Sequence, residues 1–404
     1  MRVPRFVRPL SVAAWLTVMS ATLASAQNSP ILPSTKVVLA GPISFYPTIA
    51  LRDAGTDSNV YIESENPRQD FTYSVVPRLY VVAPIGNTRF IGTGFGDIVY
   101  YQTYKDQQSI SGSFQGRYEV VSPGLRPFAV IGFADRRERR GLEIDARVRQ
   151  RQKTVSAGAE MDVTSKTAVT GWVRRVKTGW DRNAQYFDAL LSDQLDYNSN
   201  TVAGGARFRA TPLTTISLTA ELSHDRFDHE PLRNADKLFV GPSAEFDGAE
   251  LIGRVRAGYQ RFSPLNPTLA QYDGLAAAAS VQYTFFDLTR IKVDFDRDVD
   301  YSYDTIQPYY LESGGLLTIA HRVIGPFEIV AMGERRSLQN RRLGSTSFDG
   351  RYEVTRTVGG GVAIQIRKQM RFEVIYDRRA RKSSEPFRRE YERRRVYGAA
   401  VYGL

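Results

Sequence analysis

Alternation of apolar and polar residues runs through most of the chain, and residues 280–298, SVQYTFFDLTRIKVDFDRD, show it most clearly. The second half of this segment places a charge at nearly every other position, with Ile291, Val293 and Phe295 between the charges. Successive side chains of a β-strand point to opposite faces, so this pattern predicts a hairpin with one charged and one apolar face. The apolar face could meet a second sheet, as in a soluble sandwich, or lipid, as in a transmembrane barrel.

The same period recurs in about eighteen segments bounded by turn residues, which predicts an all-β chain. Most segments reach the length of about 9 to 11 residues that a tilted transmembrane strand needs, whereas strands of soluble proteins most often have about 5 to 6. The predicted strands are residues 45–52, 71–83, 89–101, 109–121, 126–136, 153–163, 167–178, 200–211, 214–227, 237–246, 251–262, 274–285, 289–301, 309–322, 327–338, 353–366, 371–381 and 394–404.

The connections between these segments alternate between short and long with few exceptions. Short ones such as PIGNT, SPGL and DGAE are rich in turn residues, whereas RERRGLEIDARVRQRQ and KSSEPFRREYERR are long and polar. A barrel with short periplasmic turns and long extracellular loops has this pattern, and a sandwich has no reason to show it. The sequence therefore predicts a transmembrane antiparallel up-and-down β-barrel of about eighteen strands.

The N-terminal 26 residues have the features of a cleaved secretory signal peptide. Three arginines precede an apolar run, and small residues at Ala24 and Ala26 fit a cleavage site. The apolar run is short for a membrane helix, which disfavours an uncleaved anchor. We therefore expect a signal peptide at 1–26, a short periplasmic segment at 27–44 and a barrel at 45–404, in the outer membrane of a Gram-negative cell.

Composition narrows the partners and the chemistry. The formal charge is +11, yet export makes nucleic acid an unexpected partner, and outer-membrane lipid, lipopolysaccharide or polysaccharide is expected instead. The chain has no cysteine, which excludes disulfides, thiolate metal sites and thiol catalysis. The final strand, RVYGAAVYGL, is similar to the terminal signal by which the barrel-assembly machinery engages such proteins, although these commonly end in Phe rather than Leu.

The charged rows of the predicted strands are candidates for the lining of a lumen, because a barrel of about eighteen strands leaves an aqueous channel. Both signs occur, so the rows could neutralise one another as a structural lattice or form a weakly anion-favouring pore. Arg297 breaks its row and could reach lipid headgroups or turn inward at a bulge. The candidates are Arg117, Glu119, Arg207, Arg209, Arg254, Arg256, Arg290, Lys292, Asp294, Asp296, Arg371 and Glu373.

Two long loops have distinctive compositions. In residues 179–199, the apolar residues have helical spacing, so this loop could fold into the lumen and narrow it, or form an ordered cap or strand extension above the membrane. The loop at 136–153 is strongly basic and could meet anionic lipopolysaccharide or polysaccharide, or make ordinary lipid-headgroup contacts. The arginines of this loop are Arg136, Arg137, Arg139, Arg140, Arg147, Arg149 and Arg151.

Catalysis is the rival class of function. His224 and His229 lie near Asp225 and Asp228 on a predicted extracellular rim, where outer-membrane hydrolases place their active sites. No nucleophile or metal-ligand spacing accompanies them, and histidines in polar loops are usually solvated. We therefore expect no enzymatic activity, no metal and no cofactor.

The chain resembles the outer-membrane β-barrel porins of the porin-2 type, some of which accompany exopolysaccharide-synthesis operons. The resemblance rests on PTIALRDAGTDSNVY, RERRGLEIDARVRQ, PLRNAD and DRDVDYSYDTIQPYYLESG, which span most of the mature chain. It implies an outer-membrane location and a porin-like role without catalytic residues. We expect a channel for passive diffusion of small solutes or an export conduit; the alternatives are a component of polysaccharide export or assembly, a non-conducting surface-binding barrel and a rim-located hydrolase.

Overall fold

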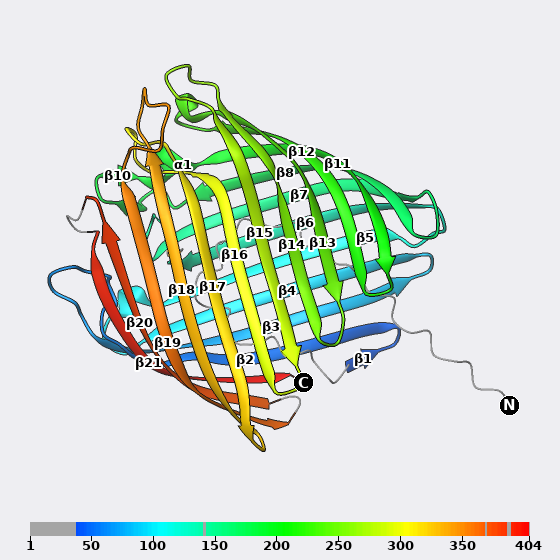
Figure 1. Cartoon of the computed structure of the whole chain (residues 1–404), viewed down its shortest axis with the longest axis horizontal. Coiled ribbons are helices and arrows are strands. Elements are labelled where there is room, and N and C mark those ends of the chain that lie inside the picture. Colours follow the sequence, from blue (N-terminus) through cyan, green and yellow to red (C-terminus); the bar gives the residue numbers. More distant parts are fainter. Residues whose placement is uncertain (1–37, 140–142, 368–369, 386–388, 404) are drawn as a thin grey trace.

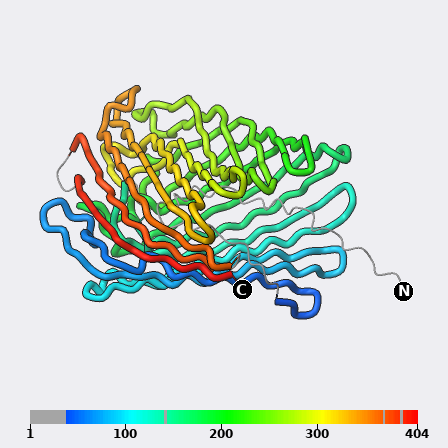
Figure 2. The backbone as a smooth tube through the Cα atoms, turned by 60° about the horizontal axis from the view of Figure 1, so that its bottom comes forward, coloured from blue at the N-terminus to red at the C-terminus, as the bar shows by residue number. Residues whose placement is uncertain are grey.

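The computed structural model describes residues 38–139, 143–367, 370–385 and 389–403. Eighteen long antiparallel strands form one closed sheet, because the first, β2 (Ile43–Asp57), pairs with the last, β21 (Tyr391–Gly403), as well as with β3 (Asp70–Ile85). Figures 1 and 2 show this closure as blue and red strands lying side by side. The predicted signal peptide lies outside the described residues.

Each of the eighteen predicted segments coincides with one barrel strand, so the predicted fold class is confirmed. The other strands are β4 (Thr88–Tyr101), β5 (Ser109–Val120), β6 (Leu125–Glu138), β7 (Val148–Asp162), β8 (Thr167–Trp180), β11 (Tyr197–Thr211), β12 (Thr214–Phe227), β13 (Ala235–Asp247), β14 (Leu251–Pro264), β15 (Tyr272–Phe285), β16 (Thr289–Tyr301), β17 (Tyr309–Ile324), β18 (Phe327–Arg341), β19 (Tyr352–Arg367) and β20 (Met370–Ser383). The short β1 (Val38–Ala40) pairs with the start of β2.

Short turns and long loops occupy opposite rims of the barrel. The turns include 86–87, 212–213 and 325–326, and the loops include 58–69, 139–147 and 181–196. We call the rim with the long loops the outer rim. Small elements lie in these loops: η1 (Lys105–Gln107), η2 (Pro231–Arg233), α1 (Leu191–Leu195), and the hairpin of β9 (Gln185–Tyr186) and β10 (Ala189–Leu190). No helix in the described ranges is long and apolar enough to cross a membrane.

The hairpin predicted at 280–298 is present, formed by β15 and β16. Val281 of β15 lies opposite Val293 of β16, and Ser280 donates a hydrogen bond to Asp294, opposite it (2.7 Å). The connecting turn has positive φ at Phe286 (49°) and Asp287 (56°). A turn with two positive φ angles matches the right-handed twist of the strands it joins.

The closing strand β2 has a bulge at Arg52 and Asp53. Its register shifts there against both neighbours, and Asp53 has a positive φ of 52°. The bulge allows both charged side chains to find partners: Arg52 pairs with Asp97 of β4 (3.6 Å) and Asp53 with Arg395 of β21 (3.0 Å). The seam that closes the barrel is thus tied by ion pairs as well as by backbone hydrogen bonds.

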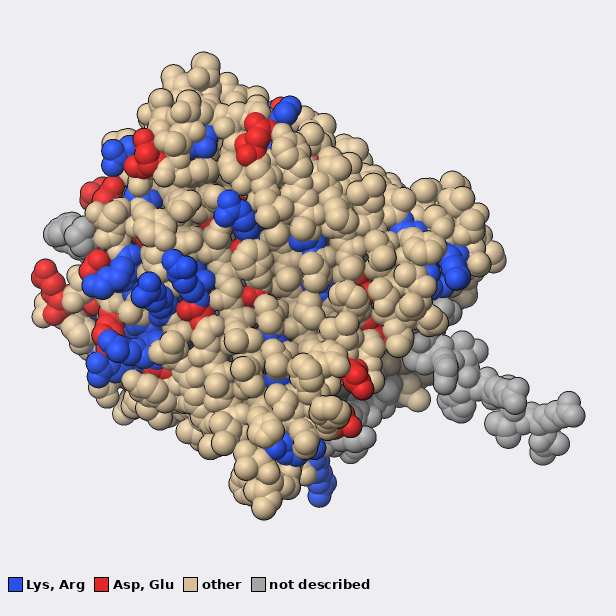
Figure 3. All heavy atoms as spheres, viewed as in Figure 1, with Lys and Arg blue, Asp and Glu red and all other residues tan. Residues whose placement is uncertain are grey.

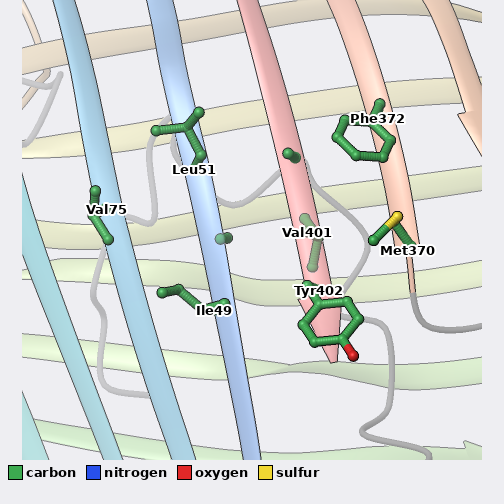
Figure 4. A pocket seen from close by; sticks show the side chains of 9 residues that line it. Ile49, Leu51, Val75, Met370, Phe372, Val401 and Tyr402 are labelled. Atoms are coloured by element: carbon green, nitrogen blue, oxygen red, sulfur yellow. The ribbon is translucent and has the colours of Figure 1, made fainter. Parts of the chain in front are cut away.

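A shallow apolar groove of about 290 Å³ lies at the same seam (Figure 4). Ala400 is small and stands opposite Leu51 and Phe372 in the flanking strands, which leaves the space open. The residues that line the groove include no charged side chain. Its lining residues are Ile49, Ala50, Leu51, Val75, Met370, Phe372, Ala400, Val401 and Tyr402.

Candidate functional site: the lumen and its outer mouth

The charged rows of the strands lie on the concave face of the barrel, and contacts that skip a strand place them there. Arg336 of β18 pairs with Asp296 of β16 (3.0 Å), with β17 between the two strands. Arg256 of β14 likewise pairs with Glu221 of β12 (2.9 Å) across β13. Side chains converge on the inside of a closed sheet and diverge on the outside, so such pairs form on the inner face.

Eleven of the twelve residues that the sequence assigns to the lumen take part in ion pairs. The exception is Arg209, which forms no ion pair with any described residue. The pairs are Arg89–Glu119, Arg117–Glu119 (2.6 Å), Arg207–Glu160, Arg254–Glu245 (2.5 Å), Arg256–Glu221 (2.9 Å), Arg290–Glu328 (2.7 Å), Lys292–Asp294 (3.0 Å), Arg336–Asp296 (3.0 Å), Arg371–Glu328 and Arg371–Glu373 (3.2 Å). This pairing favours a mutually neutralised lattice over a row of free cations.

Arg336 is the centre of the densest part of this lattice. Its side chain is 8% exposed and contacts three carboxylates: Asp296, Glu312 (2.7 Å) and Glu334 (2.8 Å). Three anions around one buried cation satisfy its guanidinium fork with charge-assisted hydrogen bonds. Removal of the cation would leave three carboxylates facing one another at low exposure.

At the outer rim, the loop between β6 and β7 crosses the mouth of the barrel. Its residue Glu143 accepts hydrogen bonds from the side chain of Asn340 in β18 (3.3 Å) and from Arg351, which precedes β19. In the ring of eighteen strands, β7 and β18 are nine strands apart in both directions. A contact between the loop after β6 and residues at β18 therefore spans the full width of the mouth.

The β16–β17 hairpin leans inward to meet this loop. Pairing of β15 with β16 stops at Arg297, whereas β16 remains paired with β17 up to Tyr301 and Tyr309. Above Arg297, the face that pointed outward becomes buried: Tyr301 is 6% and Tyr309 1% exposed. Both rings pack against Phe262 on the inner face of β14, at centroid distances of 5.7 and 4.8 Å. The tip of the hairpin thus lies within the mouth.

The loop at 181–196 joins the same cluster. Leu191 and Leu195 of α1 are buried in it together with Tyr301, and Tyr186 packs edge-on against Tyr303 of the β16–β17 loop (4.9 Å). Of the two alternatives for this loop, the structure favours inward packing over a cap. The helix is shorter than the apolar spacing indicated, because Phe187 has a positive φ of 50° and forms the turn of the β9–β10 hairpin.

We call the inward-packed residues of loops 139–147, 181–196 and 302–308 the mouth assembly. Arg233 of η2 also holds it together, by donating hydrogen bonds to the backbone oxygens of Ser302 and Asp304 (2.9 Å) and to the Gln194 side chain (2.8 Å). Arg233 is 4% exposed, and burial lowers the pKa of its guanidinium. A buried cation that donates to three acceptors fixes the loops relative to one another.

Glu143 is the buried carboxyl group of the mouth assembly. It is 1% exposed and accepts hydrogen bonds from Ser302 Oγ (2.5 Å), the Tyr303 backbone (3.1 Å), Asn340 and Arg351. Burial raises the pKa of Glu143, and the Arg351 guanidinium acts in the opposite direction without cancelling this effect. The protonation state of Glu143 therefore depends on whether the mouth is packed.

For Asp145, two residues further on, the effect of nearby cations on the pKa outweighs the effect of burial. Asp145 accepts a hydrogen bond from the Tyr391 hydroxyl of β21 (2.6 Å) and lies 3.7 Å from Arg381 of β20. Burial alone would raise the pKa of Asp145, but the nearby cations Arg379 and Arg381 outweigh burial, so the pKa is lowered. Asp145 stays charged and ties the loop to the last two strands of the barrel.

The basic loop is shorter than the sequence indicated, because β6 and β7 extend through its two ends. Arg136 and Arg137 belong to β6, and Arg149 and Arg151 belong to β7. The last two pair with Asp135 at 2.8 and 3.3 Å. A cation beside its own carboxylate is less available to an external anion. Contact of this loop with lipopolysaccharide stays a prediction.

Arg139 and Arg147 of this loop point back to the protein. Arg139 donates to the backbone oxygen of Val60, and Arg147 donates to Ser109 Oγ (2.5 Å). Burial lowers the pKa of Arg139. Arg140 lies outside the described residues.

The histidine cluster on the outer rim has structural partners. His224 faces Asp236 of β13 (2.9 Å), which also accepts a hydrogen bond from Arg226 (2.8 Å). Asp225 points to the other face of β12, where it accepts a hydrogen bond from Tyr301 (2.8 Å). The strand thus separates the two residues that the sequence places together. In the part of the chain that the structure describes, no three His, Asp or Glu side chains form a metal-binding group.

Sequence reasoning missed the residues that build the mouth. Glu143, Arg233 and Arg351 lie in polar loops, where charged side chains are usually solvated. One signal was present: LEID, residues 142–145, places Ile144 between two acids within a strongly basic loop, and Ile144 is 6% exposed. An apolar residue flanked by acids among cations indicates a segment that folds back on the protein.

Residues 39–401 match the family described as "Putative beta-barrel porin 2", which covers almost all of the described chain. No curated protein matches the sequence significantly.

Several solved structures of proteins from Pseudomonas aeruginosa share the fold. They include OccK2 (OpdF), with a TM-score of 0.52 and 8% identity, and OccK1 (OpdK), with 0.50 and 11%. OccK2 in complex with glucuronate gives 0.50 and 9%. Each comparison covers 89% of this chain and 98% of the other. At such low identity the likeness shows a common barrel fold alone.

Proposed function

This chain belongs to the beta-barrel porin 2 family and is a porin-like barrel of the outer membrane, and we propose that it conducts small solutes passively through a mouth narrowed by its own loops. The observation that carries this proposal is the contact of Glu143 with Asn340 and Arg351 across the mouth. An eighteen-stranded barrel leaves an aqueous channel, so loops packed across its outer end become the narrowest point. The width of the mouth would then limit the size of the solutes that pass.

The inner wall supports weak charge selectivity. Rings of one sign filter ions, whereas neighbouring charges of opposite sign cancel within a few ångströms. The wall carries both signs in close pairs, such as Arg256–Glu221 and Arg290–Glu328. We therefore propose a channel for small solutes of either charge, and a reversal potential close to zero in a salt gradient.

Planar-bilayer conductance of the purified, refolded protein tests this function. Glu143→Ala removes the carboxyl group that joins the loop to the opposite wall, so we expect larger or more frequently fluctuating single-channel currents. Glu119→Ala is the matched control, because it removes a carboxylate that pairs with Arg89 and Arg117 within the wall, far from the mouth.

Three results would contradict the proposal. A folded barrel without conductance would favour an export conduit that needs partner proteins, or a non-conducting surface-binding barrel. Equal currents for the wild type and Glu143→Ala would show that the loop is not the narrowest point of the channel. A strongly anion-selective reversal potential would show that the paired wall does not govern permeation.

We also propose the accompanying features of such a porin. Residues 1–26 act as a cleaved signal peptide, 27–44 form a short periplasmic segment, and the last strand engages the barrel-assembly machinery. The barrel contacts outer-membrane lipid, with lipopolysaccharide in the outer leaflet and polysaccharide as a further partner. Its family consists of porins rather than enzymes, which supports a role without catalysis.

A further inference from the structure

Five arginines gather on the convex face of the barrel near the outer rim: Arg297, Arg335, Arg356, Arg378 and Arg394. We call them the outer arginine patch. They alternate along their strands with inner-face residues such as Arg336, so they point away from the lumen. Figure 3 shows basic side chains gathered at the left of the view, over the parts of β18 to β20 nearer the outer rim.

The register brings the cations of this patch close together. Arg335 of β18 lies directly opposite Arg356 of β19, and Arg378 of β20 lies directly opposite Arg394 of β21. Residues directly opposite in an antiparallel pair have Cβ atoms only about 4.5 to 5.5 Å apart, and like charges in such positions repel. Two repelling pairs side by side form a local concentration of positive charge.

The protein supplies little negative charge to this patch. Arg378 and Arg394 share one carboxylate, that of Glu392, at 2.8 and 2.7 Å. Among the described residues, no carboxylate pairs with Arg335 or Arg356, and Arg297 donates to the hydroxyl of Ser313 (2.7 Å). Five cations therefore face one anion, and the neutralising charge must come from outside the chain.

Two other arginines of the convex face differ in this respect. Arg226 of β12 pairs with Asp236 at 2.8 Å, and Arg261 of β14 pairs with Asp273 at 2.9 Å. Each of these arginines has its own carboxylate on the same face. Arg226 and Arg261 are thus neutralised within the described part of the protein, unlike Arg335 and Arg356.

The patch lies in the outer part of the apolar band, from which long arginine side chains can reach the outer headgroup layer. Arg297, Arg335 and Arg378 each lie eight residues above the turn end of their strand, at Thr289, Phe327 and Met370. At about 3.4 Å per residue and a tilt near 45°, this is roughly 19 Å above the periplasmic end of a band about 25 Å tall. Directly below, the convex face is apolar: Val358, Val374 and Tyr376 are exposed.

From this geometry we infer that the outer arginine patch binds the phosphate groups of lipopolysaccharide in the outer leaflet. A phosphorylated glycolipid places anionic oxygens within reach of these side chains and its acyl chains against the apolar strands below. Arginine forks bind phosphate oxygens bidentately, and a shared phosphate turns the repulsion between Arg335 and Arg356 into joint binding. The inference rests on the membrane placement proposed above.

The test is binding of purified lipopolysaccharide to the refolded full-length protein in detergent, measured by native mass spectrometry with titration. The triple variant Arg335→Gln, Arg356→Gln, Arg378→Gln should bind at least tenfold more weakly than the wild type. The charge-keeping triple Lys variant should retain most of the affinity. The double variant Arg226→Gln, Arg261→Gln is the matched control and should bind like the wild type. A heat-modifiable shift on gels verifies that each barrel has folded.

Ligand controls separate the sources of phosphate. Dephosphorylated lipopolysaccharide should bind the wild type as weakly as intact lipopolysaccharide binds the triple Gln variant. The inference is overturned if the triple Gln variant binds normally, if the control variant loses as much affinity, or if phosphatidylglycerol displaces lipopolysaccharide at equal phosphate. Because binding is measured without current, failure here is distinguishable from failure of the channel function.

Discussion

Arg335 and Arg336 are consecutive residues of β18, and they meet opposite environments. Arg336 faces the lumen, is 8% exposed and contacts three carboxylates of the wall. Arg335 faces outward, is exposed, and lies opposite another arginine without a carboxylate among the described residues. The inner face neutralises its charges with its own residues, whereas the outer face leaves part of that task to the surrounding membrane.

This difference follows from what each face can contact. Inner side chains converge, so one cation reaches acids on its own strand and on strands two positions away. Outer side chains diverge and border on lipid, where headgroup phosphates lie near the outer rim. Charges on the inner face therefore stabilise the fold. Charges on the outer face relate instead to the position of the barrel in the membrane.

The largest expected effect that tests this comparison comes from Arg336→Met. Removal of the cation leaves Asp296, Glu312 and Glu334 without their shared partner, and breaking a buried ion network costs about 3 to 5 kcal/mol. Urea unfolding of the barrel in lipid vesicles at neutral pH measures this. Arg335→Met, one residue away, should change the free energy of unfolding by less than about 1 kcal/mol, because exposed charges contribute little. Equal losses of unfolding free energy for the two variants would contradict the difference between the inner and outer faces.

A smaller effect is expected from Glu143, an inner carboxyl group whose burial is only partly compensated. Its pKa is raised from a usual value of 4.5, so its contribution to the packed mouth is fully present below that value and is lost as the pH rises through the raised pKa. We expect channel currents to fluctuate more as the pH increases above about 4.5. Glu143→Gln mimics the protonated form and should remove this dependence.

Asp145 provides the control for that pH profile. Its pKa is lowered from 3.8, so its contribution is present above that value and is lost only at more acidic pH. Asp145→Asn should therefore leave the change above pH 4.5 in place. If Asp145→Asn abolished it and Glu143→Gln did not, the assignment of the titrating group would be wrong.

The smallest effect is expected from His224 and His229, which the sequence offered as a rim site. His224 pairs with Asp236 on the outer face, apart from the lumen and the mouth assembly. His224→Ala combined with His229→Ala should leave conductance unchanged. Appearance of a hydrolytic activity in the wild type that this variant loses, with the barrel intact, would show that the outer face also carries chemistry.

The wall could be predicted from the sequence because its information is local. Alternation between residues such as Lys292, Val293 and Asp294 sets the faces of a strand, and turn residues set its ends. The mouth assembly depends instead on contacts between distant loops: Glu143 and Arg351 are 208 residues apart. No sequence periodicity predicts a contact between residues so far apart.

The outer arginine patch also could not be predicted from the alternation of apolar and polar residues. Arg297 interrupts an apolar row, and the sequence left open whether it turned inward at a bulge. The register shows no shift there, so Arg297 stays on the outer face opposite Ser313. Arg335 and Arg356 became neighbours only once the register of β18 and β19 was known.

The contacts of Asp145 with the last two strands have a consequence for how the molecule assembles. Tyr391 and Arg381 arrive with the final hairpin of the chain, yet they hold a loop that belongs to its first half. Contacts between residues this far apart form late, because the intervening chain must be ordered first. The entrance thus reaches its final shape only after the final hairpin has entered the wall, which makes its closure a reporter of completed folding.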